Sequence, residues 1–226
     1  MAEGTVLREI YLIRHGESTG NAGIEAVDAV DGTDPFLSEK GLVQADKLGR
    51  LVRDYGFAAV FSSGLRRAVA TANGIIKNGG ADVLEILPDI CEIGVDPDYP
   101  GQSLDALREI CSAARLADGY ENAEKLVVGD DSPKEDESRY FERAKKVLDY
   151  LASRFENGEK IALVSHAAFL TYILFFIIGY RDKEPNYDFR LTNTGITKIV
   201  FYAPGTYEFG DTVFDYINDT QHLSEN

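Results

Sequence analysis

The chain has 226 residues, of which 44% are hydrophobic and 27% charged, and its formal net charge is -15 at pH 7. This length and hydrophobic content suffice for an ample core, and we expect one elaborated domain over residues 1–226. A strongly negative surface repels polyanions, so neither nucleic acid nor an anionic membrane is an expected partner. Any phosphate site must therefore create its own positive field.

The composition also bounds location and metal chemistry. The first ten residues lack the basic and apolar regions of a secretory signal, which predicts a cytoplasmic protein. The most apolar window, residues 167–179, is shorter than the roughly 20 residues that span a bilayer, and we interpret it as a buried helix. Cys91 and Cys111 show no metal-ligand spacing, so two buried free thiols are expected.

Strand and helix patterns alternate along the first ninety residues. Short runs rich in β-branched and aromatic residues are separated by segments whose apolar residues recur on one helical face. The predicted elements are strands at 8–13, 58–62 and 83–87 and helices at 38–56 and 65–77, the first helix capped by Ser38. This order favours an α/β fold with three layers, α/β/α, around a mostly parallel sheet.

The second half begins with a break in that pattern. Residues 93–136 are rich in turn residues and carry one predicted helix at 104–116, and we interpret them as an insertion that caps the site at the edge of the sheet. A capping box at Ser132–Glu135 then predicts a helix that ends at Asn157-Gly158. The remaining predicted elements are strands at 161–165 and 195–202, a helix at 167–178, and a C-terminal extension at 204–226. Its aromatic stretch 207–216 is compatible with a short hairpin at a sheet edge or with a homodimer interface.

Several chemically versatile residues follow the ends of these strands. His15 follows the first strand and His166 a later one, although the chain has only three histidines. Carboxyl ends of parallel strands meet at one edge, which is where ligands bind in open α/β sheets. Ser62-Ser63, Arg66-Arg67 and Glu92 are brought to the same edge. An imidazole can attack phosphorus, arginines bind phosphate oxygens, and a carboxylic acid can protonate a leaving oxygen, so the set indicates phosphoryl transfer.

These motifs resemble the histidine phosphatase superfamily, which includes the phosphoglycerate mutases. The similarity spans most of the chain between Arg8 and Val200. It rests on Arg14–Ser18 with Asn21, Pro35–Gly41, Ser62–Ala68 with Thr71-Ala72, and Ser165-His166. The resemblance implies a metal-independent enzyme without a cofactor that acts on a small phosphorylated substrate.

The resemblance also implies roles for individual residues. His15 would accept the phosphoryl group and Glu92 would be the general acid, with Asp89 as a weaker alternative. Arg67 is preferred to Arg66 because it directly precedes Ala68, as in the family pattern. The residues expected to bind the phosphoryl oxygens or the substrate are Arg14, Ser18, Asn21, Arg67, His166 and the backbone N–H of Ala167.

Two pKa shifts should accompany these roles. Arginines beside His15 disfavour the imidazolium and keep the nucleophile neutral. Burial of Glu92 under the insertion should raise the pKa of its carboxyl group and keep it protonated. We therefore expect an optimum between acidic and neutral pH.

The sequence departs from the mutases at two places. Ala167 and Ala168 follow the second histidine where the family has glycine, often with asparagine after it in mutases. The insertion carries few cations for a second anionic group, namely Arg108, Arg115, Lys125 and Lys134. A phosphatase is therefore favoured over a mutase-type isomerase, and a non-catalytic phosphate or phosphopeptide binder is a third hypothesis.

Candidate specificity residues at the rim are Tyr99, Gln102 and Tyr120, while Ser62 and Ser63 would contact substrate or cap the next helix.

Overall fold

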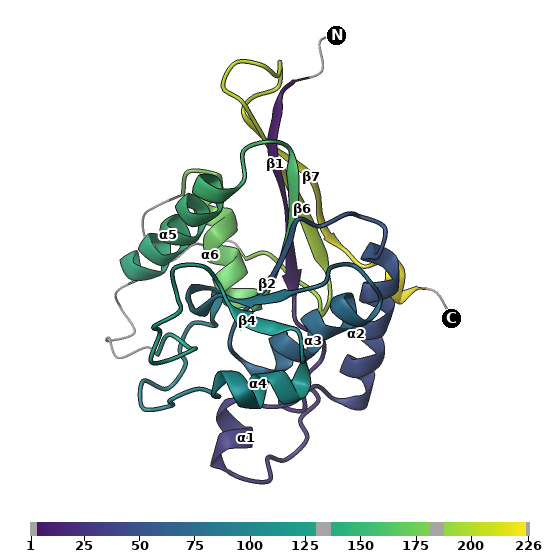
Figure 1. Cartoon of the computed structure of the whole chain (residues 1–226), viewed down its shortest axis with the longest axis vertical. Coiled ribbons are helices and arrows are strands. Elements are labelled where there is room, and N and C mark those ends of the chain that lie inside the picture. The colour runs from purple at the N-terminus through teal and green to yellow at the C-terminus, as the bar shows by residue number, and fades with distance from the viewer. Residues whose placement is uncertain (1–3, 130–136, 181–187, 225–226) are drawn as a thin grey trace.

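The protein is seen in a computed structural model that describes residues 4–129, 137–180 and 188–224 (Figure 1). The capping box predicted at Ser132–Glu135 lies outside the described residues. Within them, one sheet contains strands in the order β4-β3-β2-β5-β1-β6-β7. The strands are β1 (Val6–Arg14), β2 (Ala59–Ser62), β3 (Leu84–Ile86), β4 (Ala114–Leu116), β5 (Glu159–Ser165), β6 (Ile196–Tyr202) and β7 (Thr212–Asp219). Neighbours from β4 to β1 are parallel, whereas β6 runs antiparallel to β1, and β7 to β6.

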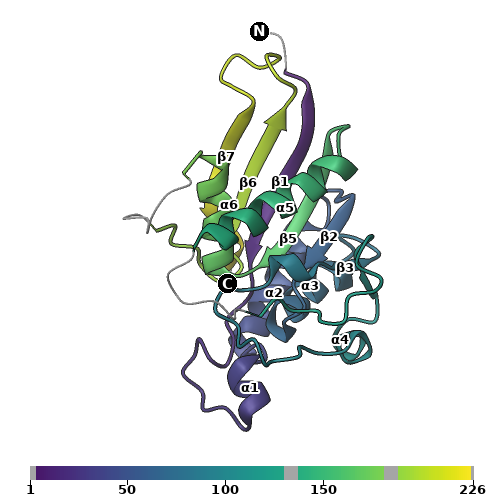
Figure 2. The same ribbon diagram turned by 90° about the vertical axis from the view of Figure 1, so that its left-hand side faces the viewer.

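Helices cover both faces of this sheet, which confirms the predicted three-layer α/β/α fold. In Figures 1 and 2, α5 and α6 lie on one face and α2 and α3 on the other. The helices are α1 (Ala29–Thr33), α2 (Glu39–Val52), α3 (Arg66–Lys77), α4 (Leu104–Ile110), α5 (Ser138–Arg154) and α6 (Ala167–Ile177), with short 3-10 turns η1 (Pro88–Ile90) and η2 (Gln221–Leu223). Ser38 caps α2 as predicted, because its Oγ accepts a hydrogen bond from the N–H of Gly41 at 3.1 Å.

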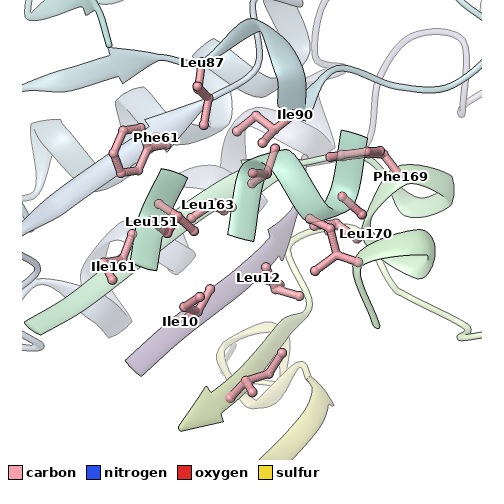
Figure 3. Close-up of a cluster of buried hydrophobic side chains, with 14 of the residues drawn as sticks. Ile10, Leu12, Phe61, Leu87, Ile90, Leu151, Ile161, Leu163, Phe169 and Leu170 are labelled. Atoms are coloured by element: carbon pink, nitrogen blue, oxygen red, sulfur yellow. The ribbon is translucent and has the colours of Figure 1, made fainter. Parts of the chain in front are cut away.

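The period of two in β1 explains how one strand serves two cores. Ile10 and Leu12 point to the layer of α5 and α6, where they join Leu163 and Leu170 (Figure 3). The intervening residues of β1 belong to the second core, beneath α2 and α3. Alternate side chains of a strand point to opposite faces, so a strand buried on both faces must be apolar throughout. The run Ile10–Ile13 meets that condition and fixes β1 in the centre of the sheet.

Three features of the secondary structure differ from the sequence expectations. The helix predicted at 104–116 ends at Ile110, and β4 follows it. Pairing of β4 with β3 gives hydrogen-bond partners to backbone groups that β3 would otherwise leave open at the edge of the sheet. The stabilisation from these bonds outweighs the helix propensity of the β4 residues. The loop between residues 16 and 35 contains the short helix α1, capped by Asp28. The terminal hairpin is larger than the stretch 207–216, because β7 pairs with β6 across the connection 203–211.

Two minor expectations concern the cysteines and the apolar window. Cys91 and Cys111 are buried free thiols, as predicted, and burial raises the pKa of Cys91 to about 11. The apolar window forms the buried helix α6. Among the described helices, none has the length and apolar character needed to cross a bilayer.

Helices α2 and α3 approach so closely that only glycine fits between them. A Cβ added to Gly74 would lie 2.2 Å from the carbonyl oxygen of Ala45. We predict that Gly74→Ala lowers the free energy of unfolding by about 1 to 3 kcal/mol, because separating two backbones outweighs the gain of up to about 1 kcal/mol in helix propensity. Urea unfolding followed by circular dichroism would measure the change. Lys77→Ala, on the exposed side of α3, is the control, and equal stability of both variants would contradict the prediction.

Candidate active site

The ends of four parallel strands converge on one edge of the sheet, as the sequence predicts. His15 follows β1, Ser63 follows β2, Glu92 lies beyond β3, and His166 follows β5. Backbone hydrogen bonds hold these ends together, since His15 N–H donates to the carbonyl of Ser165 at 2.9 Å and Ser63 N–H to that of Val164 at 3.2 Å. A cleft of about 270 Å³ opens here, and it is lined by Arg14, His15, Ser18, Gly20, Asn21, Gly32, Thr33, Pro35, Arg67 and Glu92.

His15 is buried, with 4% of its surface exposed, and its ring is oriented by two neighbours. Its Nδ1 lies 2.7 Å from the carbonyl oxygen of Gly16. A carbonyl only accepts, so this bond assigns the ring proton to Nδ1 and leaves a lone pair on Nε2. The Nε of Arg67 donates to that Nε2 at 3.3 Å, which agrees with the assignment. Burial, followed by the charge of Arg67, lowers the pKa of His15 well below its ordinary value, so the imidazole is neutral.

Two guanidinium groups line the cleft beside this ring. Arg14 donates from Nη1 to the carbonyl of Leu191 at 2.7 Å, while its buried Nε has no hydrogen-bond partner within the described residues. The Nη1 of Arg67 likewise lacks a hydrogen bond there, with the nearest carboxylate oxygen of Asp34 at 3.7 Å. Buried donors of this kind are costly unless something accepts from them. The arrangement suits the oxygens of an anion held next to His15.

His166 is fully buried beside His15, and the two ring centres are 5.0 Å apart. Its Nε2 lies 2.7 Å from Oγ of Ser63. When that hydroxyl donates, the ring proton resides on Nδ1, which has no hydrogen-bond partner among the described residues. Burial and then the charge of Arg67 lower the pKa of His166 well below its ordinary value. Ser63 therefore orients a neutral ring; its Oγ also accepts from the N–H of Leu65 at 3.3 Å.

Glu92 lines the cleft, and its carboxyl group lies against the N-terminus of α6. Its Oε1 accepts hydrogen bonds from the N–H groups of Ile93 at 3.0 Å and Phe169 at 3.1 Å. These two bonds and the charge of Arg67 favour the carboxylate, but the cost of desolvation is larger, so burial raises the pKa of Glu92. The raised pKa agrees with the sequence expectation for a group that donates a proton.

The alternative acid and the expected rim residues lie elsewhere. Asp89 is absent from the cleft lining and pairs with Nζ of Lys146 at 2.7 Å; Tyr120 donates its hydroxyl to the same carboxylate. Tyr99 is buried and donates to Oδ2 of Asp34 at 2.9 Å, and Gln102 donates to the Tyr99 hydroxyl. None of the candidate rim residues Tyr99, Gln102 and Tyr120 belongs to the cleft lining. All three find polar partners inside the protein.

The loop after β1 brings two predicted substrate contacts to the cleft. Oγ of Ser18 accepts from the N–H of Asn21 at 3.1 Å, and Oδ1 of Asn21 accepts from the side-chain amide of Asn193 at 3.3 Å. The amide of Asn193 also donates to the backbone carbonyl of His15 at 2.9 Å. Ala167 is the first residue of α6, where backbone N–H groups have no acceptor within the helix. Ser18 and Asn21 line the cleft, whereas Ala167 and His166 do not.

Sequence reasoning missed the polar network that holds the start of α3. Asp34 is fully buried and accepts from the N–H of Arg66 at 2.9 Å. The Arg66 side chain turns toward the same segment, donating from Nε to the Asp34 carbonyl at 2.7 Å and stacking on Phe36. Adjacent helical residues point about 100° apart, so Arg67 faces His15 while Arg66 faces away. The pair Arg66-Arg67 and the acidic loop before Pro35 were the only sequence signals of this network.

No cluster of three or more His, Cys, Asp or Glu side chains with the spacing of a metal site occurs in residues 4–129, 137–180 and 188–224. The cations of the cleft lining are the two arginines, and its carboxylate is Glu92. The arrangement thus combines a neutral imidazole, two guanidinium groups and a carboxyl group with a raised pKa around one small anion-sized space.

The chain matches the model of the histidine phosphatase superfamily, branch 1, over residues 10–209, and it belongs to that superfamily. Members of this superfamily are phosphatases or mutases. The family assignment agrees with the resemblance carried by the motifs around His15, Arg67 and His166.

Comparison with individual proteins gives the same family. The chain is 31% identical over 219 residues to the "Probable phosphoglycerate mutase GpmB" of Erwinia tasmaniensis, covering 96% of this chain and 95% of that protein. Its fold is similar to that of a phosphoserine phosphatase mutant from Entamoeba histolytica in complex with phosphoserine, with a TM-score of 0.61, 23% identity, and coverage of 96% and 100%. A phosphoglycerate mutase from Bacillus anthracis is similar too, with a TM-score of 0.62, 21% identity, and coverage of 98% and 97%. These structural similarities concern the fold alone.

Proposed function

We propose that the protein is a metal-independent phosphomonoesterase that acts on a small phosphorylated metabolite. In the first step, Nε2 of His15 attacks phosphorus, an N–P bond forms, and the bond from phosphorus to the leaving oxygen breaks. Glu92 gives its proton to that oxygen, so an alcohol departs. In the second step, Glu92 takes a proton from water, whose oxygen attacks phosphorus; the N–P bond breaks, and phosphate and neutral His15 result.

The orientation and protonation of His15 carry this proposal. The Gly16 carbonyl fixes the proton on Nδ1, so the Nε2 lone pair lies beside Arg67 at the cleft. Arg14 and Arg67 have donor atoms to spare for phosphoryl oxygens. Fixed positive groups around the phosphoryl group stabilise charge without reorganisation during the reaction, which supplies most of the catalysis in such sites.

Glu92 argues against a site that only binds phosphate. A carboxyl group beside a bound phosphate dianion weakens binding whenever it ionises, and holding it neutral requires the desolvation described above. A binder gains nothing from this group, whereas a hydrolase needs its proton. The geometry therefore favours catalysis over recognition.

A mutase-type isomerase is the second candidate, and the relationship to the probable phosphoglycerate mutase supports it. A mutase must also hold a second anionic group, which requires further cations. The described cations of the cap point elsewhere, because Arg108 pairs with Asp105, Arg115 with Glu85, and Lys125 donates to the carbonyl of Pro97. Lys134 lies outside the described residues. This distribution of charge favours the phosphatase.

Product analysis separates the candidates. The purified protein would be incubated with 3-phosphoglycerate and with phosphoserine in the presence of a chelator, and ³¹P NMR would follow the phosphorus species. We expect inorganic phosphate to accumulate in proportion to the substrate consumed. Formation of 2-phosphoglycerate with little free phosphate would establish the mutase instead. Saturable binding of both compounds without any new phosphorus signal would establish a binder.

A further inference from the structure

Arg143 on α5 contacts two segments next to Glu92: the chain just before it, and the first turn of α6, which hydrogen bonds to its carboxyl group. Its Nη2 donates to the carbonyl of Cys91 at 3.0 Å, and Cys91 directly precedes Glu92. Its guanidinium carbon lies 4.2 Å from the centre of the Phe169 ring. Phe169 is also the residue whose N–H donates to Oε1 of Glu92 at 3.1 Å. One side chain thus links the chain before Glu92 to the helix turn that orients its carboxyl group.

The burial of this arginine is expensive and calls for an explanation. Desolvation lowers the pKa of Arg143, and its buried Nε has no hydrogen-bond partner among the described residues. Removing a guanidinium group from water is destabilising unless its donors are used. Arg143 is absent from the cleft lining, so it does not contact a phosphoryl group held there by Arg14 and Arg67. Two of its contacts are instead to neighbours of Glu92, and its guanidinium carbon also lies 5.9 Å from the centre of the Tyr140 ring.

We propose that Arg143 is a positioning residue for proton transfer by Glu92. It holds the Cys91 carbonyl and the Phe169 ring at a fixed separation, so that Oε1 of Glu92 stays on the backbone N–H groups and Oε2 carries the proton. This inference rests on the proposed phosphatase activity and adds a residue to it. Loss of Arg143 should impair the proton transfers made by Glu92, including the one to a poor leaving group, and leave phosphate binding almost intact.

The dependence of the rate on the leaving group tests the proposal. An alkyl phosphate such as glycerol 3-phosphate expels a poor leaving group that needs the proton, whereas p-nitrophenyl phosphate expels a stable phenolate that does not. In single-turnover experiments we expect Arg143→Met to slow phosphoenzyme formation about 10- to 100-fold from the alkyl ester and less than about threefold from the aryl ester, with substrate affinity nearly unchanged; hydrolysis of the phosphoenzyme uses Glu92 whichever ester formed it. The rates of Arg143→Lys should lie between those of the unmodified protein and those of Arg143→Met, because an ammonium group can donate to the carbonyl but cannot stack as a planar guanidinium does.

Two comparisons keep the result interpretable. Lys146→Met removes a cation of the same helix that pairs with Asp89, and its rates on both esters should equal those of the unmodified protein. In a Glu92→Gln background, Arg143→Met should cost little further, since it acts through a group already lost. Melting curves check that each variant is folded, and if Arg143→Met does not fold, Arg143→Lys carries the comparison.

Failure of the proposed function and failure of the positioning role of Arg143 would give different results. If the unmodified protein hydrolyses neither ester, the proposed function is wrong and the role of Arg143 falls with it. If it hydrolyses both and the Arg143 variants form the phosphoenzyme more slowly by the same factor from the two esters, or lose affinity alone, only the positioning role is overturned. A full additional loss in the Glu92→Gln background would also overturn it.

Discussion

His15→Ala should lower kcat for phosphomonoester hydrolysis by about 10⁴-fold or more, because the covalent route through the phosphoenzyme disappears with the nucleophile. The fold should survive, since the ring lies at the cleft and its partners are the Gly16 carbonyl and Arg67. Steady-state release of phosphate from p-nitrophenyl phosphate, with a melting curve on the same sample, measures both. Substantial turnover by the folded variant would refute the assignment.

Trapping the intermediate gives the same prediction a second readout. A brief incubation with ³²P-labelled substrate, quenched in alkali, should leave label on the unmodified protein, and that label should be released by acid, as a phosphoramidate requires. His15→Ala should carry none. His222→Asn is the matched control, because it alters the histidine that contacts Thr194 at 2.9 Å outside the cleft lining, and it should retain the label.

Glu92→Gln should have the next largest effect, a loss of about 10²- to 10⁴-fold in the rate of phosphoenzyme formation from alkyl phosphates and a much smaller loss in that rate from p-nitrophenyl phosphate. Glutamine preserves an oxygen that can accept from the N–H groups of Ile93 and Phe169, so the change removes the proton and leaves the geometry. Single-turnover assays that follow release of the alcohol or phenol from the two substrate classes would measure it. Equal losses on both would show that Glu92 contributes something other than a proton.

The pKa shifts of Glu92 and His15 predict how the rate changes with pH. A raised pKa keeps Glu92 protonated to higher pH than an exposed glutamate, and the rate should fall as pH rises through that pKa. The lowered pKa of His15 keeps the nucleophile neutral into the acidic range, so loss on that side should come only at low pH. We expect kcat/KM for an alkyl phosphate to be greatest between acidic and neutral pH, and the alkaline fall to vanish in Glu92→Gln. A rate that rises steadily to about pH 9 would contradict this.

Local patterns were enough to predict the strands that deliver the site. The apolar runs before His15 and His166 are buried on both faces, and such runs in an alternating chain lead to a parallel sheet whose carboxyl ends meet. The choice of Arg67 over Arg66 followed from its position before Ala68, and the structure places Arg67 on His15. Sequence therefore indicated both the edge of the sheet and the residues gathered there.

Contacts between distant segments could not be predicted in this way. The bond between Ser63 and His166 joins residues 103 apart, and that between Asn193 and the His15 carbonyl joins residues 178 apart. The role of Arg143 depends on how α5 packs over η1 and α6, and nothing in the periodicity of α5 distinguishes it from other charged positions. β4 escaped prediction for the same reason, because it is stabilised by β3 and not by its own three residues.

The position of β4 has a consequence for how such a protein can change over generations. The cleft is lined by the end of β1, the loop after it, the start of α3 and Glu92, whereas the segment 94–129 contributes the edge strand β4 to the sheet. No residue of that segment lines the cleft, so its length can change without removing a cleft residue. A single inserted residue before Arg67, in contrast, would turn α3 by about 100° and carry the guanidinium group away from the imidazole. The margin of the sheet therefore tolerates changes of length that the start of α3 does not.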